Sequence, residues 1–173
     1  MYVNEFDKSK SCAMIGQSAE DLFEDWLNKN KVSYRKATLE EQYRHIDFVV
    51  RHLKTNKEIT VDVKAPKKKS RYDSSTSPSI IWVEFVNVRG DRGWLYGDNE
   101  YTIFHYKEKD GFLCVKTKEL AELCETLCCK GTTDRSSDAL YKKYTRAGRK
   151  DVISMIYLSD VLKCKSVAFV KYE

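Results

Sequence analysis

Two charged side chains interrupt an otherwise apolar segment, Thr60-Val61-Asp62-Val63-Lys64. Because successive side chains of a β-strand point to opposite faces, Asp62 and Lys64 share one face and the two valines share the other. A second acid, Asp47, stands between two core-type residues in the preceding apolar segment. Carboxylates beside a lysine on neighbouring strands can hold a divalent cation and act on a phosphate group.

The spacing of the two acids depends on how their strands pair. Segments 44–53 and 57–65 are typical of β-strands, and we expect a tight two-residue turn at Thr55-Asn56 between them. That turn would set Asp47 opposite Lys64 and make Asp47 and Asp62 diagonal neighbours, roughly 7–8 Å apart at the backbone. A slip of one residue would separate them onto opposite faces.

A fourth candidate lies on the first predicted helix, over residues 17–28. At 100° per residue, Glu20 falls at the edge of the apolar stripe of this helix, whereas Glu24 lies further round and Asp21 points away. A carboxylate at the rim of the packing face can reach the sheet that the helix covers, so Glu20 is preferred. The stripe consists of Ala19, Leu22, Phe23, Trp26 and Leu27.

Three acids and one lysine suit phosphodiester hydrolysis. Oxygen ligands fit Mg²⁺ or Mn²⁺, and Mg²⁺ usually takes one or two carboxylates besides water and phosphate. Lys64 could orient or deprotonate the attacking water, or stabilise the charge that develops on phosphorus. The alternative is that Asp47, Asp62 and Lys64 form a structural ion-pair network on an exposed sheet face.

The ordered set Gly16-Gln17-Ser18-Ala19-Glu20, His45-Ile46-Asp47-Phe48 and Val61-Asp62-Val63-Lys64 resembles the PD-(D/E)XK nuclease superfamily. The resemblance covers roughly residues 16 to 65. It implies Glu20, Asp47 and Asp62 as metal ligands, Lys64 as the catalytic lysine and a restriction-endonuclease-like core, as in phage enzymes or Holliday-junction resolvases. Two positions depart from the pattern: Ile rather than Pro precedes Asp47, and the third acid is Asp rather than the commoner Glu.

Two basic runs in a chain of net charge +5 favour a polyanionic partner. Both runs contain tyrosines that could lie against sugar or base, Tyr72 in the first and Tyr141 and Tyr144 in the second. A solvated surface is the alternative for each. The candidate nucleic-acid-binding residues are Lys67, Lys68, Lys69 and Arg71, then Lys142, Lys143, Arg146, Arg149 and Lys150.

Three further groups have two interpretations each. His45 would share a strand face with Asp47 and could contact phosphate, or it could make a structural hydrogen bond. Glu84, in the strand predicted over 80–88, could join the site or face solvent. Cys124 and Cys128 fall on the apolar stripe of a helix predicted over 117–129, which favours core packing over a metal site.

Length and composition indicate one α/β (α+β) domain over residues 1–173. The predicted order is helix, strands, helix, strands, which suits a mixed central sheet flanked by helices. The N-terminus is charged, and no segment approaches the run of about 18 apolar residues that a membrane span needs. We therefore expect a soluble cytoplasmic protein without a membrane partner, in a bacterial or phage-infected cell.

Together these patterns predict a Mg²⁺-dependent deoxyribonuclease that cuts DNA internally. A homodimer would suit it, since cutting two strands takes two sites. Two alternatives stay open. A catalytically inactive nucleic-acid-binding module of the same fold would bind DNA with or without metal, and a protein-binding regulator would show no salt-dependent DNA affinity.

Overall fold

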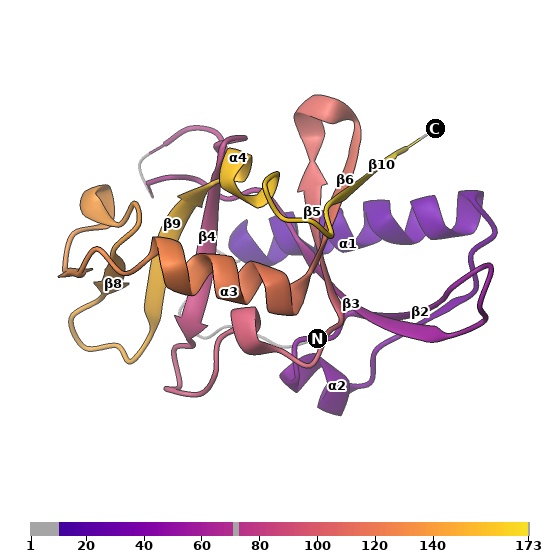
Figure 1. Ribbon diagram of the computed structural model, residues 1–173, viewed down its shortest axis with the longest axis horizontal. Coiled ribbons are helices and arrows are strands. Elements are labelled where there is room, and N and C mark those ends of the chain that lie inside the picture. The colour runs from indigo at the N-terminus through magenta and orange to yellow at the C-terminus, as the bar shows by residue number, and fades with distance from the viewer. Residues whose placement is uncertain (1–10, 71–72, 173) are drawn as a thin grey trace. The chain divides into compact units, whose positions relative to one another are not determined.

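The computed structural model describes residues 11–70 and 73–172, which contain both helices and strands, as the sequence predicts. The described chain divides into two compact units, and each has its own mixed sheet (Figure 1). Both units are built from separate stretches of chain. The first takes in the described residues up to Ala65, then Asp98–Cys114 and the chain from Ala168; the second takes in Pro66–Gly97 and Val115–Val167, less 71–72.

The sheet of the first unit has six strands in the order β1-β2-β3-β5-β6-β10. Strand β3 pairs antiparallel with β2 but parallel with β5, so the sheet is mixed. The strands are β1 (Tyr34–Lys36), β2 (Phe48–Arg51), β3 (Glu58–Lys64), β5 (Tyr101–Tyr106), β6 (Gly111–Lys116) and β10 (Ala168–Lys171).

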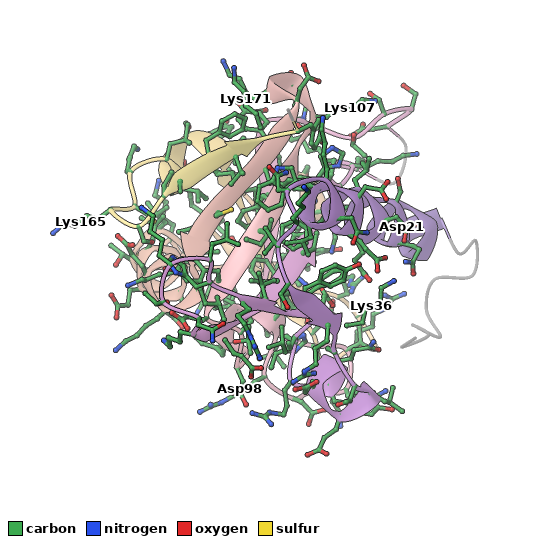
Figure 2. The ribbon with its side chains drawn as sticks, turned by 90° about the vertical axis from the view of Figure 1, so that its right-hand side faces the viewer. Asp21, Lys36, Asp98, Lys107, Lys165 and Lys171 are labelled. Carbon is green, nitrogen blue, oxygen red and sulfur yellow. The ribbon has the colours of Figure 1, made fainter. Side chains whose placement is uncertain are left out.

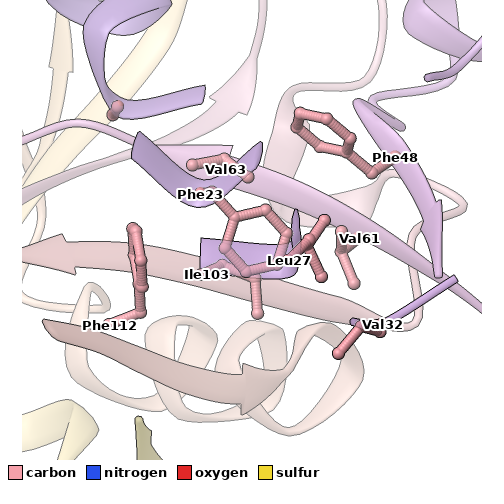
Figure 3. Packing of buried hydrophobic residues seen from close by; sticks show 9 residues of the cluster. Phe23, Leu27, Val32, Phe48, Val61, Val63, Ile103 and Phe112 are labelled. Atoms are coloured by element: carbon pink, nitrogen blue, oxygen red, sulfur yellow. The ribbon is translucent and has the colours of Figure 1, made fainter. Parts of the chain in front are cut away.

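Helix α1 (Ser11–Lys29) packs on this sheet through the predicted stripe, except that Leu22 is 37% exposed and lies outside the core cluster. Phe23 is only 5% exposed, and its ring meets the edges or faces of Phe48 and Phe112 at centroid separations of 5.5 and 5.2 Å (Figure 3). Val61 and Val63 of β3 join the same cluster. Since they occupy the face of β3 that meets α1, alternation turns Asp62 to the opposite face.

The pairing of β2 with β3 differs from the predicted register by two residues. Phe48 pairs with Val61 and Arg51 with Glu58, so Asp47 does not face Lys64 as predicted. An even shift keeps every side chain on its expected face, because the side-chain period of a strand is two. The two acids are therefore still brought together.

The cause of the shift is the loop between the strands, which is longer than the predicted two-residue turn. The His52 N–H donates to the Lys57 carbonyl and the Asn56 N–H donates to the His52 carbonyl, each at 2.8 Å. The His52 ring also accepts the Thr55 N–H at 3.2 Å. These bonds close a four-residue loop instead.

The strand predicted from residue 44 begins only at Phe48, because a short helix and the turn that follows it come first. Helix α2 (Leu39–Tyr43) begins at a capping box, in which Thr38 accepts the Glu41 N–H and Glu41 accepts the Thr38 N–H. His45 follows with φ +61°, a left-handed conformation that does not occur within a strand. His45 therefore does not share a strand face with Asp47, which corrects that prediction.

The second unit has a four-stranded sheet in the order β4-β9-β8-β7, in which β7 and β8 are parallel and the other pairs antiparallel. Cys124 and Cys128 are buried on and just after α3, which confirms their predicted place in the core. Nowhere in residues 11–70 or 73–172 is a helix both long and apolar enough to span a membrane. The helices and strands of the second unit are β4 (Ile80–Val86), β7 (Thr132–Thr133), β8 (Lys143–Thr145), β9 (Val152–Tyr157), α3 (Thr117–Leu127) and α4 (Leu158–Val161).

Candidate active site

Asp62 is an almost completely buried carboxylate in the middle of β3, 2% exposed. Lys64, two residues further along the same face, places its Nζ 2.7 Å from Asp62 Oδ1. On the neighbouring strand β5, the buried Thr102 pairs with Asp62 in the parallel register. With Asp47 ionised, Asp62 Oδ2 accepts no hydrogen bond from the part of the chain that the structure describes. A buried oxygen without a donor is costly, so this atom has an unmet need for a proton or a cation.

Asp47 is fixed against the same strand by its backbone and its side chain. Its N–H donates to the Val61 carbonyl at 2.8 Å, and its Oδ2 accepts the Val63 N–H at 2.7 Å. The hydrogen bonding between these two strands thus continues to Asp47, one residue before the start of β2. It lies next to Asp62, close enough for a proton on Asp47 to be shared between the two carboxyls.

Burial and mutual repulsion govern the protonation of this pair. Burial, followed by the charge of Asp62, raises the pKa of Asp47 to about 7, against the opposing effects of Lys64 and the Val63 N–H. Burial also raises the pKa of Asp62, and Lys64 opposes that shift. Without a cation, the two carboxyls are therefore not both readily ionised near neutral pH.

Glu20 of α1 is electrostatically coupled to the same centre. Burial, then the charge of Asp47, raises the pKa of Glu20 to about 7, and Lys64 acts in the opposite direction. Asp21 and Lys36 also act on Glu20, and Figure 2 shows both on the same side of the first unit. The structure thus brings all four predicted residues within electrostatic range of one another.

Glu24, the other helical acid considered, is engaged elsewhere. Its carboxylate pairs with Lys36 of β1 at 2.6 Å and accepts the Tyr34 hydroxyl at 2.9 Å. These contacts agree with the preference for Glu20. The sequence did not indicate Lys36 or the Val63 N–H, because β1 is short and weakly patterned and a backbone donor has no signature in residue types.

The two secondary candidates, His45 and Glu84, come from a turn of the first unit and from a strand of the second. His45 occupies the left-handed turn between α2 and β2 and is half-buried. Glu84 is half-buried on β4, in the second unit, whereas Asp47 and Asp62 belong to the first.

The predicted basic residues beyond Lys64 fall in the second unit and differ in exposure. Lysines 67–69 and Lys150 are exposed, whereas Lys142 and Arg149 are half-buried. Arg71 lies outside the described residues.

Two of these cations are engaged within the second unit. Lys143 pairs with Glu125 at 3.2 Å and lies over the Phe85 ring, 4.6 Å from its centroid. Arg146 pairs with the buried carboxylate of Asp151. Both contacts hold side chains of the unit together, so a phosphate would compete with them.

Within residues 11–70 and 73–172, no group of three or more His, Cys, Asp or Glu side chains is arranged to hold a metal ion. Glu20 therefore does not complete a three-acid set with Asp47 and Asp62. The pair itself still fits Mg²⁺ or Mn²⁺, because Mg²⁺ usually takes only one or two carboxylates and Asp62 Oδ2 lacks a partner. Comparison of the chain with known protein families, curated proteins and solved structures finds no match.

Proposed function

We propose that the protein is a metal-dependent endonuclease that hydrolyses phosphodiester bonds in DNA. The observation that carries this proposal is the unpartnered Oδ2 of Asp62, buried beside a second carboxylate and on the same strand face as a lysine. Buried carboxylates that repel each other are expensive to maintain. Binding of a cation between the two carboxylates would explain this arrangement, whereas packing alone does not.

Asp47 and Asp62 would hold Mg²⁺ or Mn²⁺ through carboxylate oxygens, with Glu20 of α1 as a further acid coupled to them. The chemistry that such an ion supplies when bound is polarisation of a phosphoryl oxygen and acidification of a bound water. For the ion to bind, Asp47 must give up its proton. Glu20, whose pKa is also about 7, could then accept or return a proton near neutral pH.

Lys64 is suited to act at the edge of this centre. Its side chain is 21% exposed, so its ammonium group can meet solvent or substrate while it pairs with Asp62 Oδ1. There it would orient the attacking water or stabilise negative charge on the phosphate. Asp62 holds the lysine in place, and we expect loss of either residue to impair the same step.

DNA is the substrate favoured by the charge of the chain, +5 overall, and by the basic residues of the second unit. A homodimer would bring two such centres to the two strands of a duplex. We place this enzyme in the cytoplasm of a bacterial or phage-infected cell, where DNA and Mg²⁺ are both available.

A second candidate is a nucleic-acid-binding module that does not cut. The observation that favours it is the Lys64–Asp62 ion pair, which partly neutralises Asp62 without metal, together with the lack of a three-acid group among the described residues. Such a module would bind DNA equally well in EDTA and in Mg²⁺.

The experiment that separates the two candidates is incubation of the protein with supercoiled, linear, single-stranded and four-way-junction DNA, in Mg²⁺, Mn²⁺ or EDTA. The endonuclease proposal expects cleavage in Mg²⁺ or Mn²⁺ and none in EDTA, and the preferred substrate would define the type of enzyme. Binding without cleavage in any metal would favour the module instead.

A further inference from the structure

The lysine-rich loop after β3 is braced at its backbone. The Lys67 carbonyl accepts the Ser77 N–H at 3.0 Å, and the Lys68 carbonyl accepts the indole Nε1–H of Trp82 at 3.0 Å. The side chains of lysines 67–69 are nevertheless exposed. The backbone of the loop is thus fixed by hydrogen bonds, while its lysine side chains are exposed to solvent.

Trp82 also connects this loop to the second basic run. Its ring lies 6.3 Å from the ring of Tyr144, centroid to centroid, on the same face of the second sheet. Both rings are half-buried against a small core of Ile80, Ala139 and Met155. Tyr144 is in β8, which begins one residue after Lys142. Trp82 therefore contacts both the lysine-rich loop and β8, which are some 75 positions apart along the chain.

We propose that Trp82 and Tyr144 join these segments into one surface that binds the sugar–phosphate backbone of a nucleic acid. The basic surface is defined by Lys67, Lys68, Lys69 and Lys142. The proposal deepens the proposed function, on which it rests for the choice of DNA as the partner. Trp82 is a positioning residue in this scheme, because it acts on the lysines through the loop backbone.

The composition of the surface favours a nucleic acid over an anionic membrane. Among the described residues, Lys68, Lys69 and Lys142 have no carboxylate partner, so their charges are available to phosphate. The Trp82 ring packs against Tyr144 and its N–H is used inside the protein, so it is not placed to insert into a bilayer. Several cations on one surface suit the phosphates that follow one another along a strand.

The first test is the salt dependence of binding to a fluorescent DNA duplex in EDTA, where no cleavage occurs. The triple variant Lys68→Ala/Lys69→Ala/Lys142→Ala should reduce the slope of log affinity against log salt by up to about 2.7, since each lost phosphate contact removes about 0.9. The matched control Lys107→Ala/Lys118→Ala/Lys165→Ala removes three exposed lysines elsewhere and should leave the slope nearly unchanged.

The second test isolates Trp82. Trp82→Phe keeps a ring but removes the donor to Lys68, and should weaken DNA binding about fivefold, the equivalent of one hydrogen bond. It should also speed amide exchange in the loop. The control Trp26→Phe removes an indole donor to the Lys171 carbonyl, 2.8 Å away in the first unit, and should leave binding unchanged.

Equal effects of the two triple variants, or of the two tryptophan variants, would overturn the proposal. So would a wild-type protein that binds phosphatidylserine vesicles but not DNA. Because every measurement is made in EDTA, absence of nuclease activity would refute the proposed enzyme without affecting this result.

Discussion

At the scale of single residues, the carboxylate of Asp62 needs a compensating charge that Lys64 supplies only in part. Lys64 contacts Oδ1, and with Asp47 ionised Oδ2 accepts no hydrogen bond from the described residues. In the metal-free protein, a proton held by Asp47 can be shared with Asp62. A proton and a divalent cation therefore compete for the same pair of carboxyls.

This competition predicts how stability depends on pH in EDTA. Unfolded Asp47 releases its proton near its ordinary pKa of 3.8, whereas folded Asp47 keeps it until about pH 7. The folded state binds more protons in this window, so the free energy of unfolding should fall as pH rises through it, by up to about 1.4 kcal/mol per pH unit. Melting temperatures of wild type and Asp47→Asn between pH 4.5 and 8 measure the effect.

The variant is expected to lack this part of the slope. His105 works in the opposite direction, because burial lowers its pKa and its protonation opposes folding, but it is common to both proteins. Identical pH profiles for wild type and Asp47→Asn would show that Asp47 does not titrate as described.

Metal binding should appear as a separate stabilisation. At pH 8, Mg²⁺ or Mn²⁺ should raise the melting temperature of the wild type, because a ligand that binds only the folded state stabilises it. Asp62→Asn removes a ligand and a buried charge, so it should be at least as stable as wild type in EDTA yet gain little from metal. Scanning calorimetry with metal at about 100 times its dissociation constant should show the wild type stabilised by about 2.7 kcal/mol relative to EDTA. An equal gain in both proteins would place the metal elsewhere.

At the scale of elements, α1 holds the strands that carry Asp47 and Asp62. Phe23 is at the centre of this contact, between rings from β2 and β6. We expect Phe23→Ala to lower the free energy of unfolding by about 3–5 kcal/mol, because it leaves a cavity in a packed core. The matched control is Leu22→Ala at the neighbouring position, where the side chain is 37% exposed. This control should lower the free energy of unfolding far less. Urea denaturation of the two variants compares them, and equal losses would contradict the packing described.

The sequence predicts these elements where side-chain periodicity is strong. Apart from the exposed Leu22, the stripe of α1 and the alternation of β3 place their residues correctly, and the even register shift leaves Asp47 and Asp62 together. The register itself was not predictable from residue types, because the loop closes through backbone groups and the His52 ring. Helix α2 could have been found, since Thr38 and Glu41 have the spacing of a capping box.

At the scale of the whole molecule, the carboxylate centre belongs to the first unit and the basic surface to the second. The chain links them directly, since β3 ends at Lys64 and the lysine-rich loop begins at Lys67. The sequence predicts both the carboxylates of the first unit and the basic residues of the second. It does not predict the bond from Trp82 to the Lys68 carbonyl, because an indole in a strand gives no sign of its partner.

The most direct test of the proposed active site is the single-turnover rate of DNA cleavage in Mg²⁺ by wild type, Asp62→Asn, Lys64→Ala and the control Asp98→Asn. Asp98 is an acid of the same unit, 57% exposed and paired with Arg44 on the surface. We predict that Asp62→Asn and Lys64→Ala each slow cleavage by about 10²-fold or more, as loss of a catalytic group does, while Asp98→Asn cuts like wild type. Cleavage by both site variants at the wild-type rate would contradict the assignment of Asp47, Asp62 and Lys64 as the active site.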